Sequence, residues 1–245
     1  MNKIFRAIRR LLVSELSSRP THVVPIGLSC RVSYQVRTYF GSTTAYPFDW
    51  WLTPIDGLTR YLSDPDPDRV YGTGALEELV VGGHVTTVVA PEFGFQLYHE
   101  FPRQDVGLPT SVVAPGWRDR VSKQRVVHAR RLDRLLALNR PDRRILFVRD
   151  RLDTDGKSDD AAAESVAKLW STLASRWSRA EIELLLVNVP CDVRTPEPRI
   201  RWASFEDVRG DTAEGWHGNS AGWTRAFTSL HVATRNAPDS PNVAM

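Results

Sequence analysis

The chain has 245 residues, of which 42% are apolar and 25% are charged, a composition typical of a globular protein with a buried core. This composition excludes disorder, collagen and coiled coil as descriptions of the whole chain, and no apolar run is long enough to span a bilayer. The net charge of +3 is too small to indicate nucleic-acid binding, and the two cysteines, Cys30 and Cys191, suit a reducing compartment such as the cytoplasm.

Residues 1–19 carry a basic amphipathic pattern. Their apolar side chains recur at helical spacing, while basic residues occupy the remaining face. The apolar positions are Ile4, Ile8, Leu11 and Leu12. We expect an N-terminal helix that packs on the rest of the domain or on a second copy of the chain, and weak binding to a membrane surface is the alternative.

The next part of the chain predicts a strand, a helix and a loop in succession. A short apolar run at 22–26 predicts the strand, and a turn then leads into a helix over 30–39. An aromatic loop at 47–51 precedes a second helix, which begins with Thr53 as N-cap and Pro54 at the first helical position.

The rest of the chain supplies further strands between longer helices. We expect strands at 85–89, 93–99, 145–148, 182–189 and 200–205. We expect helices at 118–140, 161–178 and 220–234, and a solvated acidic loop at 150–160. This order predicts one α/β domain over residues 20–235, in which helices flank a central, mostly parallel sheet, followed by a disordered tail at 236–245.

Cys30 is the first candidate for chemistry. It follows a strand and a turn and opens a predicted helix, where free backbone N–H groups and the helix dipole stabilise a thiolate. Because the thiolate is the nucleophilic form of cysteine, this position predicts a reactive thiol. A small buried core thiol is the alternative.

A thiol nucleophile requires a base, and histidine is the usual one. Among the six histidines, His99 ends a predicted apolar strand, and His217 is a nearly equal rival. His128 lies on an arginine-rich helix, so we expect it to be solvated.

Four motifs resemble those of the DUF1796 family, bacterial proteins described as papain-like cysteine peptidases. The first is the segment 25–37, which contains Gly-Leu-Ser-Cys and a tyrosine-bearing helix. The second is Pro-Phe-Asp-Trp at 47–50, followed by Thr-Pro. The third is His-Glu-Phe at 99–101, where the family has His-Asp-Phe, and the fourth is an apolar strand that ends in arginine at 145–149.

This resemblance implies a thiol hydrolase, either a peptidase or an amidase or acyl transferase, with Cys30 as nucleophile and His99 as base. It also makes a papain-like α+β fold the alternative to the layered α/β domain. Asp49 is a candidate to orient His99, as the third member of a triad does. We expect the substrate to contact Ser29, Trp50, Trp51 and Arg149, and the backbone N–H of Cys30 to help form an oxyanion hole.

Two other functions remain open. Gly-Leu-Ser at 27–29 resembles the nucleophile block of SGNH-type esterases, with Ser29 as nucleophile and with Glu214 and His217 at the acid-to-histidine spacing of that class. The other alternative is a non-catalytic α/β domain that binds an anion or a sugar phosphate at the turn before a helix. Nearby arginines suited to that role are Arg31, Arg37 and Arg149.

The sequence predicts no cofactor and no metal site. It contains no nucleotide-binding glycine motif, and its two cysteines are too far apart in the chain to indicate a metal cluster. The expected partner is a peptide or acyl substrate, with no nucleic acid. Peptide, isopeptide, thioester and glycan-linked acyl groups all remain open as substrates.

Overall fold

The computed structural model of the chain describes residues 20–107, 111–151, 159–189, 196–207 and 215–230. The predicted N-terminal helix at 1–19 and the predicted tail at 236–245 lie outside these residues. Within the described residues, no helix has the length and apolar character needed to cross a bilayer.

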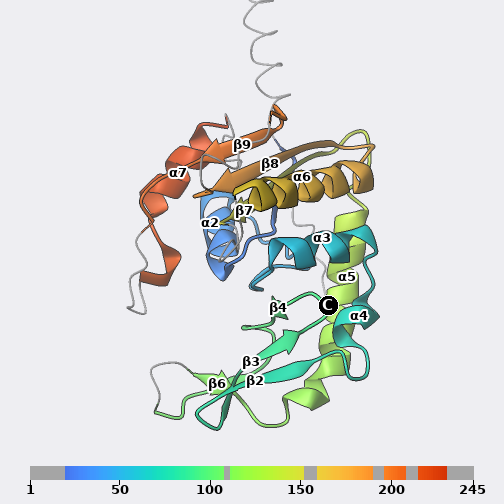
Figure 1. Ribbon diagram of the computed structural model, residues 1–245, viewed down its shortest axis with the longest axis vertical. Coiled ribbons are helices and arrows are strands. Elements are labelled where there is room, and N and C mark those ends of the chain that lie inside the picture. Colours follow the sequence, from blue (N-terminus) through green and yellow to red (C-terminus); the bar gives the residue numbers. More distant parts are fainter. Residues whose placement is uncertain (1–19, 108–110, 152–158, 190–195, 208–214, 231–245) are drawn as a thin grey trace, which may run out of the picture.

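A four-stranded parallel sheet forms one half of the molecule (Figure 1). Its strands, in spatial order, are β1 (His22–Pro25), β7 (Arg144–Asp150), β8 (Glu181–Val187) and β9 (Ile200–Ala203). Each neighbouring pair is parallel, so all four carboxyl ends lie at one edge of the sheet. The predicted α/β class with a central parallel sheet is confirmed, and the papain-like α+β alternative does not describe this sheet.

Helices cover both faces of the parallel sheet. One face carries α2 (Cys30–Phe40) and α7 (Ser220–Thr228), which pack on Leu146 and Val148 of β7. The opposite face carries α3 (Ile55–Ser63), α5 (Val121–Leu136) and α6 (Asp159–Arg176), which pack on Ile145 and Phe147. Because successive side chains of a strand point to opposite faces, the apolar run at 145–148 supplies both cores.

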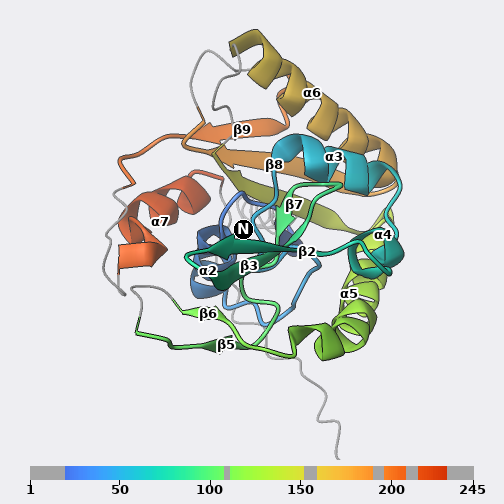
Figure 2. The same cartoon turned by 60° about the horizontal axis from the view of Figure 1, so that its bottom comes forward.

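The segment between α3 and α5 contains short helices and antiparallel strands. These elements are α4 (Pro67–Tyr71), β2 (Glu77–Val81), β3 (His84–Ala90), β4 (Phe95–Gln96), β5 (Arg103–Gln104), β6 (Val112–Val113) and the 3₁₀ helix η1 (Trp117–Arg120). Strands β2, β3 and β4 form one sheet, and β5 pairs with β6. Figure 2 brings these strands to the front. Val88 and Phe95 belong to the same core cluster as α3, α5 and α6, so the two halves share one apolar core.

Several boundaries differ from the prediction. The predicted strand at 93–99 is reduced to β4, because turns take up the residues on either side of it. Strand β2 was not predicted, since all of its residues are exposed and it lacks the apolar alternation of a half-buried strand. Helix α3 begins at Ile55, one residue later than predicted, and Pro54 rather than Thr53 is its N-cap. The buried Thr53 hydroxyl instead donates to the Gly27 carbonyl oxygen at 2.7 Å.

Candidate functional site

The turn between β1 and α2 lies at the carboxyl edge of the sheet, beside the end of β7. Asp150, the last residue of β7, accepts hydrogen bonds from the Ser29 hydroxyl at 2.5 Å and from the Leu28 backbone N–H at 3.0 Å. A side chain at Gly27 would lie 2.8 Å from the Asp150 carboxylate, so glycine is needed for this close approach. The carboxylate therefore fixes the turn that delivers Cys30 to the start of α2.

Arg149 holds three of the four motifs together. Its guanidinium donates to the carbonyl oxygens of Ile26 at 2.8 Å and of Thr53 at 2.9 Å. The side chain is fully buried, so it is not accessible to a substrate, and the predicted substrate contact of Arg149 is wrong. Its charge serves instead to join the strand β7, the turn after β1 and the segment that leads into α3.

Cys30 is a free, half-buried thiol and the first residue of α2. Burial raises the pKa of the thiol, and the nearby Asp150 charge raises it further. Backbone N–H groups of Cys30 and Arg31 and the Arg31 charge act in the opposite direction. The predicted effect of the helix terminus is therefore present, but desolvation outweighs it, and the thiolate expected from the sequence is not favoured. Cys191 lies outside the described residues.

His99 is an exposed residue in the turn after β4. Partial desolvation of its ring, followed by the charge of Arg103, lowers the pKa of the imidazole. Its ring lies 5.9 Å from the Trp50 ring and 4.9 Å from the Tyr98 ring, between centroids. No hydrogen bond in the described part of the chain joins His99 to Cys30 or to Asp49.

Asp49 binds an arginine instead of a histidine. One carboxylate oxygen accepts a hydrogen bond from Arg37 at 2.6 Å, and the other is buried without a hydrogen-bond partner. Burial raises the pKa of Asp49 although Arg37 opposes this shift. The predicted role of Asp49 in orienting His99 is not what the structure has, because its carboxylate is bound to α2 through Arg37.

The two tryptophans of the aromatic loop have different surroundings. Trp50 is half-buried, and its backbone has a left-handed conformation with φ of 68°. Its backbone N–H donates to the Ser33 hydroxyl at 3.4 Å. Trp51 is fully buried, and its indole N–H donates to Glu100 at 3.0 Å. Trp51 is therefore a core residue, and the prediction that it contacts the substrate is wrong. Glu100, the acid of the His-Glu-Phe motif, acts as its buried anchor.

His217 lies against α2. It ends the 3₁₀ helix η3 (Gly215–His217), and its ring stacks on that of Tyr34 with centroids 4.3 Å apart. The Gln35 amide donates to the His217 carbonyl oxygen at 2.6 Å, and the Arg31 guanidinium donates to the Trp216 carbonyl oxygen at 2.9 Å. Three side chains of α2, from Arg31, Tyr34 and Gln35, thus hold η3 beside the first two turns of the helix.

No family model, curated protein or solved structure matches this chain. The resemblance to the DUF1796 family therefore stays a prediction.

Sequence reasoning missed two buried groups of this site. Asp150 was assigned to a solvated acidic loop, but it is 1% exposed, and burial raises its pKa although the Ser29 hydrogen bond opposes the shift. Asp207 forms a buried ion pair with Arg31. The apolar run before Asp150 could have indicated its position, since an acidic residue that directly ends a buried parallel strand lies at the carboxyl edge of the sheet. Nothing near Asp207 in the sequence points to Arg31.

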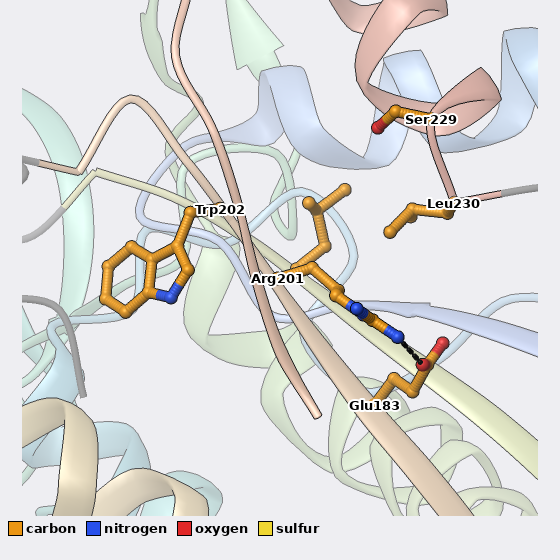
Figure 3. A pocket seen from close by; sticks show the side chains of 6 residues that line it. Glu183, Arg201, Trp202, Ser229 and Leu230 are labelled. Carbon is orange, nitrogen blue, oxygen red and sulfur yellow. Dashed lines mark hydrogen bonds and ion pairs between the residues drawn. The ribbon is translucent and has the colours of Figure 1, made fainter. Parts of the chain in front are cut away.

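A separate cavity of about 410 Å³ lies between the parallel sheet and the end of α7 (Figure 3). Its charged side chains, Glu183 and Arg201, form an ion pair at 3.3 Å, and Trp202 points to the other side of the strand. None of the predicted site residues lines this cavity. In the described residues, no group of three or more histidine, cysteine, aspartate or glutamate side chains is placed to hold a metal ion.

Proposed function

We propose that the protein is a thiol hydrolase or acyl transferase in which Cys30 is the nucleophile and His217 is the base. The observation that carries this proposal is the arrangement on α2. Cys30 and Tyr34 lie one turn apart on the same helix face, and the His217 ring stacks on Tyr34. Long side chains in a helix lean toward its N-terminus, which favours a Tyr34 ring, and an imidazole stacked on it, on the side of the thiol. As for His99, no hydrogen bond in the described residues joins His217 to Cys30.

His99 is the rival base. It is linked to the region through the ring of Trp50, and in the described residues no hydrogen bond or ring contact joins it to α2. The sequence resemblance favours His99, whereas the stacking on Tyr34 favours His217. The variants His99→Asn and His217→Asn, compared in the assay described below, distinguish these two assignments of the base.

The chemistry follows from the groups at the start of α2. The thiol proton of Cys30 moves to the His217 imidazole while the sulfur forms a bond to the acyl carbon of an ester, amide or thioester. Backbone N–H groups at the helix terminus stabilise the oxyanion. The bond to the leaving group then breaks, and the leaving group takes the proton from the imidazolium. Water or another acceptor finally releases the acyl group from the sulfur.

The raised pKa of Cys30 determines how this reaction depends on pH. Burial keeps the thiol protonated at neutral pH, so the proton must move to the base during attack. We expect the acylation rate to increase with pH above neutrality. An enzyme that already holds a thiolate and imidazolium pair would instead be active at acidic pH.

A second candidate is a serine hydrolase with Ser29 as nucleophile. The supporting observation is the hydrogen bond from the Ser29 hydroxyl to Asp150 at 2.5 Å. A carboxylate whose pKa is raised by burial is a stronger base than an exposed one, so Asp150 could accept the hydroxyl proton. The predicted esterase acid, Glu214, lies outside the described residues.

Hydrolysis of p-nitrophenyl acetate tests these assignments. We expect Cys30→Ala and Cys30→Ser to abolish activity, and His217→Asn to lower kcat about a hundredfold or more. His99→Asn is the matched control and should leave the rate unchanged. Loss of activity in His99→Asn alone would transfer the role of base to that residue. Loss in Ser29→Ala with activity kept in Cys30→Ala would favour the serine hydrolase.

A further inference from the structure

Five aromatic rings form a continuous cluster beside the start of α2. They come from Tyr34, Trp50, His99, Trp216 and His217, here called the aromatic cluster. Ring centroids lie 5.9 Å apart for His99 and Trp50, 6.3 Å for Trp50 and Trp216, and 5.0 Å for Trp216 and Tyr34. Helix α2, the aromatic loop, the turn after β4 and η3 each contribute to it. Segments far apart in the sequence therefore converge on one surface.

The aromatic cluster is open to solvent. Trp216 is 37% exposed and His99 is exposed, while the other three rings are half-buried. Contiguous exposed rings of this kind are unusual on a soluble protein and mark binding surfaces. Purely structural tryptophans in the same chain are different, since Trp177 and Trp223 are fully buried.

The rings are held in place before any ligand binds. Trp50 has φ of 68°, a conformation that is costly for a bulky residue and is kept only when its surroundings impose it. The Arg37 guanidinium lies 5.7 Å from the centroid of the Trp50 ring. Trp216 is fixed through its carbonyl oxygen by Arg31. A rigid surface loses little conformational entropy when it binds, which favours a role in recognition.

The charges around the aromatic cluster favour a neutral ligand. Of the arginines near it, Arg31 is paired with Asp207 and Arg37 with Asp49. The guanidinium of Arg103, whose charge acts on His99, donates instead to the carbonyl oxygens of Tyr98, Thr86 and Ser111. A nucleic acid that stacked on these rings would need cations to pair with its phosphates. These rings and paired charges therefore favour a ligand that has a flat apolar face and no charge.

We propose that the aromatic cluster binds a neutral pyranose sugar ring. The axial C–H groups of such a ring form an apolar face that packs on an indole, and its equatorial hydroxyls can bond to the imidazoles and to the Tyr34 hydroxyl at the margins. Tyr34 and His217 belong both to this surface and to the face of α2 that carries Cys30. If the proposed thiol chemistry is correct, on which this step rests, the substrate is a sugar that bears an acyl group.

Binding can be measured apart from catalysis in the Cys30→Ala variant. The probes are chitotetraose, cellotetraose and maltotetraose, observed through the ¹⁵N indole resonances of the eight tryptophans. We expect at least one sugar to shift the Trp50 and Trp216 resonances and to leave those of Trp177 and Trp223 unchanged. Trp216→Ala should remove one of the shifted resonances and weaken binding about tenfold.

Val126→Ala is the matched control, because Val126 is 45% exposed on α5 and belongs to no cluster. It should bind the sugar as the parent does. Shifts that are absent with all three sugars, or that only a single-stranded oligothymidylate produces, would overturn the sugar site. Sugar binding without thiol acylation would refute the proposed function alone, and acylation without sugar binding would refute the sugar site alone.

Discussion

Acidification to pH 5 should destabilise the fold through one buried histidine. His128, expected from the sequence to be solvated, is fully buried in the core. Its ring stacks on Trp51 with centroids 4.9 Å apart, and its Nε2 hydrogen-bonds with the Tyr61 hydroxyl at 2.7 Å. Burial, followed by the charge of Arg131, lowers the pKa of His128 from the usual 6.5 to about 3.

The size of the effect follows from this shift. Between pH 6.5 and 3 the unfolded chain binds a proton at His128 that the native protein does not bind, so stability is full above pH 6.5 and falls as the pH decreases. The expected loss from this residue is about 2 kcal/mol at pH 5 and about 3 kcal/mol at pH 4.

Urea unfolding at pH 7 and pH 5 measures this loss. The parent protein is compared with a double variant that carries both His128→Phe and Tyr61→Phe. This double variant removes both partners of the hydrogen bond, so neither side chain is left buried without its partner. Burial also lowers the pKa of His22, but that contribution is common to both proteins and cancels. We expect the double variant to lose about 2 kcal/mol less between the two pH values. An equal loss in both proteins would refute the assignment of a buried neutral imidazole.

Three further variants test other parts of the structure. Gly57→Ala should destabilise by about 3 kcal/mol or more in urea unfolding, because the new Cβ would lie 1.8 Å from the Phe93 carbonyl oxygen; a change below 1 kcal/mol would contradict this packing. Asp150→Asn should shift the iodoacetamide alkylation of Cys30 to lower pH, since it removes a charge that raises the pKa of the thiol; an unchanged profile would show that the two groups do not interact. Cys30→Ser should cost about 1 kcal/mol or less, because serine suits a helix start, whereas a core thiol would cost more.

Much of the layered fold was predictable from apolar periodicity. The runs at 145–148 and 182–189 became β7 and β8, because a buried parallel strand needs apolar side chains on both faces. Strand β2 could not be found in this way, since its exposed Glu-Glu-Leu-Val-Val sequence shows no buried face. His128 was misjudged because the arginines around it suggested an exposed helix, while its own position faces the core.

The candidate site was predicted only where it is local in sequence. The position of Cys30 at the start of α2 followed from a strand, a turn and a helix pattern. The stacking of His217 on Tyr34 and the hydrogen bond from Arg31 to the Trp216 carbonyl join residues more than 180 positions apart. Such contacts depend on how α2 and η3 meet in space, and no periodicity in either segment encodes them.

The most direct test of the account is to locate the acyl group on the protein after reaction with p-nitrophenyl acetate. Peptide mapping by mass spectrometry, after rapid acid quenching, should find a single acetyl group on Cys30, and its yield should fall in His217→Asn. Cys191 serves as the internal control for ordinary thiol reactivity. Acetylation of Cys30 no faster than that of Cys191, or an acetyl group on Ser29 instead, would contradict the assignment of Cys30 as nucleophile.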